Sequence, residues 1–306
     1  MAAVAGGTGL IAPRGEAPDN RGMSEITLIG VDWGSTSVRA FAIARGGAVV
    51  NVRRTDDGVF LRSGDFGARL AALLGDWPAN VPILMCGMIG SDRGWVQAPY
   101  VTAPAGLDDL AKHLVRVPFV RPAFIVPGVS LIADETCEVM RGEETIVMGL
   151  DARDALACLP GTHAKWVDVD DRRIVDFRTY MTGELRALVL GHGALATGVA
   201  QEHSHDAFAQ GLDAASSGVT SGLFQARARR LLGRLAAEHT AAFVGGVLIG
   251  EELRHEARGE RVTVAAQGEI ASAYAAALDG RPHAIEDPER AVAKGLWRIA
   301  EAAGLC

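Results

Sequence analysis

Short apolar runs, each bounded by glycine or polar residues, alternate with helical patterns along the first half of the chain. Three runs come first with tight turns between them, which predicts an antiparallel meander of strands at residues 26–31, 38–43 and 48–53. Apolar residues at helical spacing then predict a helix at residues 66–74. Later runs without polar alternation predict buried strands at residues 81–86 and 124–126.

The second half repeats this order. Its first three predicted strands lie at residues 155–159, 165–169 and 174–178. A further strand is predicted at residues 261–266. Helical patterns lie at residues 221–238, 242–257, 269–278 and 288–303. Two halves that each open with strand, glycine-containing turn and strand predict a duplicated α/β domain around a central cleft. We therefore expect a disordered N-terminal extension and two domains, at residues 1–23, 24–150 and 151–306.

The composition narrows the class of protein. The 306 residues, 49% of them hydrophobic and 22% charged, suffice for two globular domains. No apolar run reaches the roughly 18 residues of a membrane-spanning helix. The net charge of −7, without a basic cluster, disfavours a nucleic-acid partner. The four cysteines form no C-x-x-C pair, which favours a reducing cytoplasm over a disulfide framework or a zinc ribbon.

The turn between the first two strands is the first candidate site. Gly34, Ser35 and Thr36 offer backbone amides and hydroxyls that could bind phosphate oxygens. Asp32, at the end of the preceding strand, could hold Mg²⁺ through water. The same residue types also occur in ordinary β-turns, so this turn alone does not establish a phosphate site.

A matching turn follows the first strand of the second half. Gly161, Thr162 and His163 precede Lys165, one of only three lysines among the 30 basic residues. Because nearly all the other basic residues are arginines, a lysine at this position suggests that a compact charge is needed there. Two such turns that face each other predict a clamp around a triphosphate, and the pair is more specific than either member.

Two further segments combine glycine with chemically active side chains. Residues 85–95 place glycines directly after a buried strand, where a ligand could approach the backbone or aromatic residues could simply pack the connection. Residues 140–145 begin a helix at the junction of the halves. Acidic residues in a first helical turn usually complement the helix dipole. A carboxylate of Glu143 or Glu144 could also accept a proton from an attacking hydroxyl.

Two other patterns are weak indications of a site. Residues 191–196 resemble a dinucleotide fingerprint, but the residues before them look helical and the required strand is missing. His203 and His205 have no third ligand nearby in the sequence, which favours a polar loop over a metal site. No G-x-x-x-x-G-K-[ST] sequence occurs, which excludes a P-loop kinase, and no G-x-S-x-G sequence occurs either.

Six sequence blocks occur in a fixed order, at residues 32–36, 87–91, 140–145, 160–166, 176–179 and 181–184. Together they resemble the 2-dehydro-3-deoxygalactonokinase family, over residues 26–303. The resemblance implies the actin-like/hexokinase ATPase fold, in which two ribonuclease-H-like domains close on ATP. It also implies transfer of the ATP γ-phosphate to the terminal 6-hydroxyl of 2-dehydro-3-deoxy-D-galactonate, giving 2-dehydro-3-deoxy-6-phosphogalactonate in galactonate catabolism.

The resemblance and the chemistry of the side chains together suggest roles. Asp32 would take part in catalysis by organising Mg²⁺. The general base would be Glu144 or Glu143, with Glu144 slightly favoured, and Asp134 is the next candidate for that role. We expect ATP to be bound by Asp32, Gly34, Ser35, Thr36, Gly161, Thr162, His163, Lys165, Gln267 and Gly268. Arg141 suits the substrate carboxylate because its guanidinium can bind bidentately. We expect the other sugar-acid contacts at Gly87, Met88, Ile89, Gly90, Trp95 and Tyr100.

One segment departs from the family pattern. The family usually has a glycine pair after the last strand of the second domain, whereas residues 265–269 contain only Gly268, so nucleotide affinity could be weaker or altered. A non-catalytic nucleotide-binding sensor of sugar acids, or a kinase for another carboxylated sugar, are the alternative functions. The intact set of Asp32, Lys165 and the two glutamates favours an enzyme. A homodimer is left open.

Overall fold

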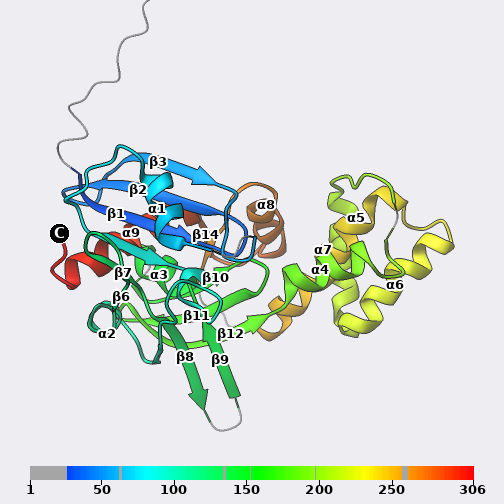
Figure 1. The fold of residues 1–306 in the computed structure, drawn as a ribbon. Coiled ribbons are helices and arrows are strands. Elements are labelled where there is room, and N and C mark those ends of the chain that lie inside the picture. The colour runs from blue at the N-terminus through cyan, green and yellow to red at the C-terminus, as the bar shows by residue number, and fades with distance from the viewer. Residues whose placement is uncertain (1–25, 62–63, 134–135, 152, 197, 257–260) are drawn as a thin grey trace, which may run out of the picture.

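The computed structural model describes residues 26–61, 64–133, 136–151, 153–196, 198–256 and 261–306. The expected N-terminal extension and Asp134 lie outside these residues. Figure 1 shows two sheets with helices around them and a group of helices to one side. Within the described ranges, every helix is too short or too polar to cross a membrane.

The first half is built on a six-stranded sheet in the order β3-β2-β1-β4-β7-β6. The predicted antiparallel meander is confirmed as β1 (Ile26–Trp33), β2 (Val38–Ala44) and β3 (Val49–Thr55). Two strands parallel to β1 and one short antiparallel edge strand complete the sheet, namely β4 (Ile83–Cys86), β7 (Ala123–Ile125) and β6 (Val115–Arg116). Because β1 and β4 are parallel neighbours, the residues that follow them lie at the same sheet edge, where α/β proteins bind ligands.

The second half has a five-stranded sheet in the order β12-β11-β10-β13-β14. Its antiparallel meander consists of β10 (Ala155–Leu159), β11 (Ala164–Asp170) and β12 (Arg173–Tyr180). The strands parallel to β10 are β13 (Val262–Ala265) and β14 (His283–Glu286). Apart from the short edge strand β6, the second sheet repeats the strand order and directions of the first, as a duplicated α/β unit predicts.

Two helices pack closely where the halves meet. They are α3 (Glu143–Gly149) and α9 (Pro288–Ala302). A Cβ atom at Gly149 would lie 1.7 Å from the carbonyl oxygen of Ala291, and one at Gly295 would lie 1.8 Å from that of Thr145. Glycine at both positions therefore allows backbone contact between the helices. Helix α9 also packs on β1, β2 and β4, and the apolar core around both helices includes residues of both sheets. The division of the chain near residue 150 remains a prediction.

A three-stranded sheet was not expected from the sequence. It pairs β5 (Tyr100–Thr102) with β8 (Gly128–Ala133), and β8 forms a hairpin with β9 (Thr136–Met140). Several side chains of this hairpin, including Ile132 and Val139, are exposed, so its apolar pattern does not resemble that of a buried strand. Strand β9 leads directly into α3.

Four helices form the group to one side in Figure 1, namely α4 (Thr182–Gly191), α5 (His205–Ala214), α6 (Val219–Leu231) and α7 (Thr240–His255). A Cβ atom at Gly211 of α5 or at Gly246 of α7 would lie 2.1 Å from a carbonyl oxygen of the other helix, so glycine permits their close packing. Helix α6 ends earlier than the predicted residue 238. Just beyond its end, Gly233 has a φ of 67°, which favours helix termination.

The remaining helices are short or lie on the outer faces of the sheets. Helix α1 has the predicted bounds, and α8 contacts β13 and β14. In chain order these helices are α1 (Phe66–Leu74), the 3₁₀ turn η2 (Met88–Gly90), α2 (Leu107–Lys112), the 3₁₀ turns η3 (Ala215–Ser217) and η4 (Ala237–His239), and α8 (Gly268–Ala277).

Candidate active site

Asp32 lies near the end of β1, beside the end of β4. Its Oδ2 accepts a hydrogen bond from Nη2 of Arg39 at 2.6 Å. Burial raises the pKa of Asp32, and the charge of Arg39 opposes this shift. Gly87 follows β4 with a φ of 89°, and a Cβ atom there would lie 2.8 Å from the carbonyl oxygen of Trp33 and 3.3 Å from Oδ1 of Asp32. Glycine at position 87 therefore keeps the space beside the carboxylate open.

The donor set at Asp32 fits a magnesium ion that is held largely by phosphates. In phosphoryl-transfer sites Mg²⁺ usually binds one or two carboxylates together with waters and substrate phosphates. Asp32 supplies one carboxylate, whose Oδ1 is not engaged by Arg39. The described residues contain no group of three or more His, Cys, Asp or Glu side chains that could hold a metal ion. A single available carboxylate suits a cation that arrives with a nucleotide and is held largely by its phosphates.

The turn between β1 and β2 is supported by the segment that follows β3. Three N–H groups of residues 58–60 donate to the carbonyl oxygens of residues 34–36 at 3.0–3.1 Å. A Cβ atom at Gly58 would lie 2.3 Å from backbone atoms of Ser35 and Thr36, so only glycine allows this contact. The amides of Ser35 and Thr36 donate to no group in the described part of the chain and remain available to an anion.

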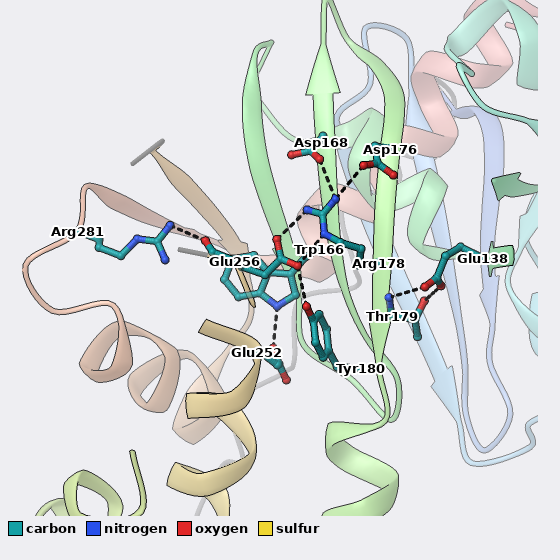
Figure 2. Close-up of polar contacts among 10 residues, drawn as sticks. All are labelled: Glu138, Trp166, Asp168, Asp176, Arg178, Thr179, Tyr180, Glu252, Glu256 and Arg281. Carbon is teal, nitrogen blue, oxygen red and sulfur yellow. Dashed lines mark hydrogen bonds and ion pairs between the residues drawn. The ribbon is translucent and has the colours of Figure 1, made fainter. Parts of the chain in front are cut away.

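The second turn, residues 161–163, joins β10 to β11 and is exposed, whereas Lys165 is only 5% exposed. Nζ of Lys165 donates to Oγ1 of Thr179 at 2.8 Å, and this hydroxyl donates to Oε2 of Glu138 at 2.5 Å. Figure 2 shows the Thr179–Glu138 contact, which joins β12 to β9. Burial lowers the pKa of Lys165, and the carboxylates of Glu143 and Glu138 oppose the shift. The ammonium is thus held between the two halves of the chain.

Glu144 is a fully buried carboxylate at the start of α3. Its Oε2 accepts a hydrogen bond from the N–H of Gly142 at 2.6 Å, and its Oε1 accepts one from the hydroxyl of Thr145 at 2.9 Å. Burial, together with the nearby charge of Glu143, raises the pKa of Glu144 to about 7. The carboxyl group can therefore change its protonation state near neutral pH.

Glu143 is less enclosed than Glu144 and lies near the second turn. Its Oε2 accepts a hydrogen bond from the backbone N–H of Arg141 at 2.9 Å. Burial raises the pKa of Glu143, and the nearby Lys165 opposes the shift. A Cβ atom at Gly142 would lie 3.1 Å from Cα of Gly87, so the start of α3 adjoins the space beside Asp32. The structure thus brings the acid pair, the lysine and the first sheet edge together.

Arg141 has a partly unpaired guanidinium. Its Nη2 donates to the carbonyl oxygen of Ala98 at 2.9 Å, and its guanidinium carbon lies 4.3 Å from the ring centre of Tyr100. Nε and Nη1 are buried without a hydrogen-bond partner among the described residues. Unpaired buried donors are unfavourable, and a carboxylate ligand would satisfy them. Gly90 leaves room for the guanidinium, since a Cβ atom there would lie 3.0 Å from Nη1.

The other predicted substrate residues lie in the connection after β4. Met88 and Ile89 belong to the 3₁₀ turn η2, in which Ile89 is buried. The ring of Trp95 stacks on Phe66 with centroids 6.4 Å apart and meets Phe119 edge-on at 5.8 Å. This aromatic cluster packs on one side of the connection. The contact of Trp95 with the sugar acid stays a prediction.

Gln267 and Gly268 follow β13, which pairs in parallel with β10. They therefore share a sheet edge with the second turn. Both residues are exposed, and Gly268 has a φ of 58° with no atom within 4 Å of a Cβ position. Their contact with a nucleotide remains a prediction.

A model of the family described as 2-keto-3-deoxy-galactonokinase matches residues 32–299. The chain belongs to this family. It is 39% identical over 232 residues to the 2-dehydro-3-deoxygalactonokinase of Escherichia coli (strain K12), a match that covers 74% of this chain and 78% of that one. A protein of Rhizobium meliloti (strain 1021), named as a probable 2-dehydro-3-deoxygalactonokinase, is 35% identical over 298 residues, or 89% of this chain and 96% of that one.

A solved structure has the same fold as this member of the 2-keto-3-deoxy-galactonokinase family. It is the crystal structure of a protein from Sinorhizobium meliloti that is provisionally named as a 2-dehydro-3-deoxygalactonokinase. The two structures superpose with a TM-score of 0.81 at 34% sequence identity, covering 90% of this chain and 98% of that one. The family resemblance and the α/β fold of the actin-like/hexokinase ATPase type are thus confirmed.

Sequence reasoning missed several polar residues that are buried or half-buried. Glu252 lies on α7 four residues after the buried Leu248, and an acidic residue on an apolar helix face could have indicated a special position. Glu138 lies on the exposed hairpin and carries no such signal. In the block at residues 176–179, Arg178 donates through Nε and Nη2 to both oxygens of the buried Glu256 at 2.7 Å, which ties the residue after α7 to β12 (Figure 2).

The first of the two weak sequence patterns has the expected structure, because residues 191–196 begin at the last residue of helix α4 and have no strand before them. The Nε2 atoms of His203 and His205 lie 3.3 Å apart, and no further His, Cys, Asp or Glu completes a metal cluster with them in the described ranges.

Proposed function

We propose that the protein is an ATP-dependent kinase that phosphorylates the 6-hydroxyl of 2-dehydro-3-deoxy-D-galactonate in galactonate breakdown. Family membership supports this activity. The structural observation that carries it is the proximity of buried Lys165, from the second half, to Glu143, which adjoins Glu144 at the end of the first half. A cation for phosphate and an acid pair for a hydroxyl group then lie in one site.

The nucleotide phosphates would lie between the two turns. The free amides of Ser35 and Thr36 would bind them from one side, and residues 161–163 with Lys165 from the other. Asp32 would hold Mg²⁺, which neutralises phosphate charge when bound. Gln267 and Gly268 would contact the nucleotide further from the phosphates. Such sites act chiefly by positioning and charge stabilisation, which fits a buried, immobilised ammonium.

The sugar acid would lie beside the connection after β4. Its carboxylate would pair with the unpaired donors of Arg141, and Tyr100 would support the guanidinium from its face. Residues 87–90 would line the sugar chain. Glu143 is better placed than Glu144 to touch the hydroxyl, because both oxygens of Glu144 are engaged by its own turn. Glu144 would then hold the turn and set the charge beside the base.

A coupled assay of ADP release tests the proposal. We expect turnover only when ATP, Mg²⁺ and a 2-keto-3-deoxy sugar acid are all present, with 2-dehydro-3-deoxy-D-galactonate preferred over its epimers. If the protein binds ATP but turns over with no such acid, the sensor function replaces the kinase function. Preference for a different carboxylated sugar would leave the reaction type intact and change the substrate.

Two wider expectations accompany the kinase. We expect it to act in the cytoplasm, where ATP and the sugar acid are available, with these small molecules as its partners. A homodimer remains a prediction, which light scattering after size-exclusion chromatography would test.

A further inference from the structure

Residues 181–184 form a sequence block to which the proposed mechanism assigns no part. In the structure they begin α4 and pack on the second turn. A Cβ atom at Gly183 would lie 2.4 Å from the carbonyl oxygen of Gly161 and 2.9 Å from Cα of Thr162. These are backbone atoms, which cannot rotate away as a flexible side chain can. Glycine is therefore required for helix and turn to approach this closely.

Glu184 adds two polar contacts between α4 and the second turn. Its backbone N–H donates to the carbonyl oxygen of Thr162 at 3.0 Å. Its Oε2 lies 2.5 Å from Nε2 of His163. Two consecutive residues of the turn are thus bound by one residue of the helix, while the turn's own N–H groups donate to no group in the described part of the chain.

The first turn of α4 is held in place by a buried carboxylate of α7. The hydroxyl of Thr182 donates to Oε1 of Glu252, which is fully buried. Nε1 of Trp166 donates to Oε2 of the same group at 2.7 Å, and the hydroxyl of Tyr274 lies 2.9 Å from both oxygens. Figure 2 shows the contact between Glu252 and Trp166, the residue after Lys165 on β11. Glu252 therefore connects α7 with both the first turn of α4 and the strand that carries the lysine.

Apolar contacts attach α4 to the other helices of its group, because its partly buried Leu185, Val189 and Leu190 pack against the apolar core that residues of α5, α6 and α7 form. The polar contacts at its first turn, in contrast, link α4 to the second turn and to the second sheet.

We propose that residues 182–184, which we call the α4 brace, position the second turn for the nucleotide phosphates, with Glu252 as the anchor of the brace. The inference rests on the proposed function in one respect, that residues 161–163 bind phosphate. Gly183, Glu184 and Glu252 are positioning residues, since they act through the turn. A displacement of about 1 Å in such a group can cost roughly a hundredfold in activity.

Two alanine substitutions in the same helix provide the test. Gly183→Ala introduces the clash with the turn, whereas at Gly191, at the other end of α4, no atom lies within 4 Å of a Cβ position. Calorimetric titration with a non-hydrolysable ATP analogue and Mg²⁺ should show at least tenfold weaker binding for Gly183→Ala. Gly191→Ala should stay within twofold of wild type. The KM for the sugar acid should change less than twofold in both variants, and circular dichroism should show both folded.

A second pair of variants tests the anchor without the clash. Thr182→Val removes the hydroxyl that binds Glu252, and Thr182→Ser retains it. We expect several-fold weaker analogue binding for Thr182→Val and near wild-type binding for Thr182→Ser. The proposal is overturned if Gly183→Ala and Thr182→Val both bind the analogue as wild type does. It is also overturned if they weaken nucleotide and sugar acid equally, because that pattern indicates general destabilisation.

The binding measurement separates this proposal from the kinase assignment. If the wild type binds the analogue but releases no ADP with any sugar acid, the kinase function fails, and the four variants still decide the role of the brace. If the wild type binds no analogue, both proposals are overturned.

Discussion

Nζ of Lys165 lies 2.8 Å from Oγ1 of Thr179, and the same hydroxyl donates to Glu138. One threonine thus joins a strand of the first half, β9, to a cation of the second half. Because Lys165 is almost fully buried, its charge is immobilised before any ligand arrives, which is what electrostatic stabilisation of a phosphoryl group requires.

Replacing Lys165 should therefore affect chemistry more than folding. Lys165→Met keeps most of the apolar stem and removes the charge, and we expect kcat to fall by about a hundredfold or more. Lys112→Met, at an exposed position on α2, is the matched control and should retain normal kinetics. Steady-state kinetics with circular dichroism make the comparison. Wild-type turnover in Lys165→Met would mean that the lysine only supports β11.

Arg141 should determine affinity for the sugar acid. Truncation of one partner in a buried charge pair costs about 2–5 kcal/mol, so Arg141→Ala should raise the KM for the acid by roughly 30-fold or more. The KM for ATP should hardly change. Arg141→Lys should rescue little, because an ammonium lacks the planar array of donors. Exposed Arg116→Ala serves as the control. An unchanged KM for the acid in Arg141→Ala would move the carboxylate site elsewhere.

Local patterns predicted those parts of the site that depend on backbone turns. The two glycine turns, the strand meanders and the start of α3 lie where hydrophobic periodicity and turn chemistry place them. The unpaired donors of Arg141, in contrast, depend on Ala98 and Gly90, which reach it only through the folded connection after β4. Sequence suggested Arg141 by resemblance and by charge, and could not show that two of its N–H groups lack partners.

Long-range polar contacts could not be predicted for a similar reason. Glu138 reaches Thr179 from a hairpin whose exposed apolar residues give no strand signal, and Glu252 meets Trp166 from a position 86 residues away in the chain. Hydrophobic patterns identify faces of helices and strands. They do not show which buried acids will meet which donors once the faces have packed.

The two glutamates of α3 should differ in kinetics. If Glu143 accepts the proton of the hydroxyl, Glu143→Gln should lower kcat by about 10²–10⁴-fold with little change in KM. Glu144→Gln should have a smaller effect, because its oxygens are engaged by Gly142 and Thr145. The reverse ranking would make Glu144 the base. Near-normal kcat in both variants would exclude the pair and make Asp134 the next residue to replace.

Glu144 should also make stability depend on pH. Its pKa in the folded protein is raised from 4.5 to about 7, so folding favours the protonated form. That contribution is fully present below about pH 4.5 and is lost as the pH rises through 7, because the folded protein then holds an ionised carboxylate in a buried site. The raised pKa corresponds to about 3 kcal/mol over this interval.

Glu144→Gln removes this titration and leaves a neutral side chain of similar shape, to which the Thr145 hydroxyl can still hydrogen-bond. Urea unfolding between pH 5 and 8 should show the wild type losing stability relative to Glu144→Gln as the pH rises, by a large part of that 3 kcal/mol. Glu301→Gln, at an exposed position, should follow the wild type throughout. A difference between wild type and Glu144→Gln that stays constant with pH would show that the carboxylate is already ionised at pH 5, and hence that the charge of Glu144 is accommodated by the hydrogen bonds from Gly142 and Thr145.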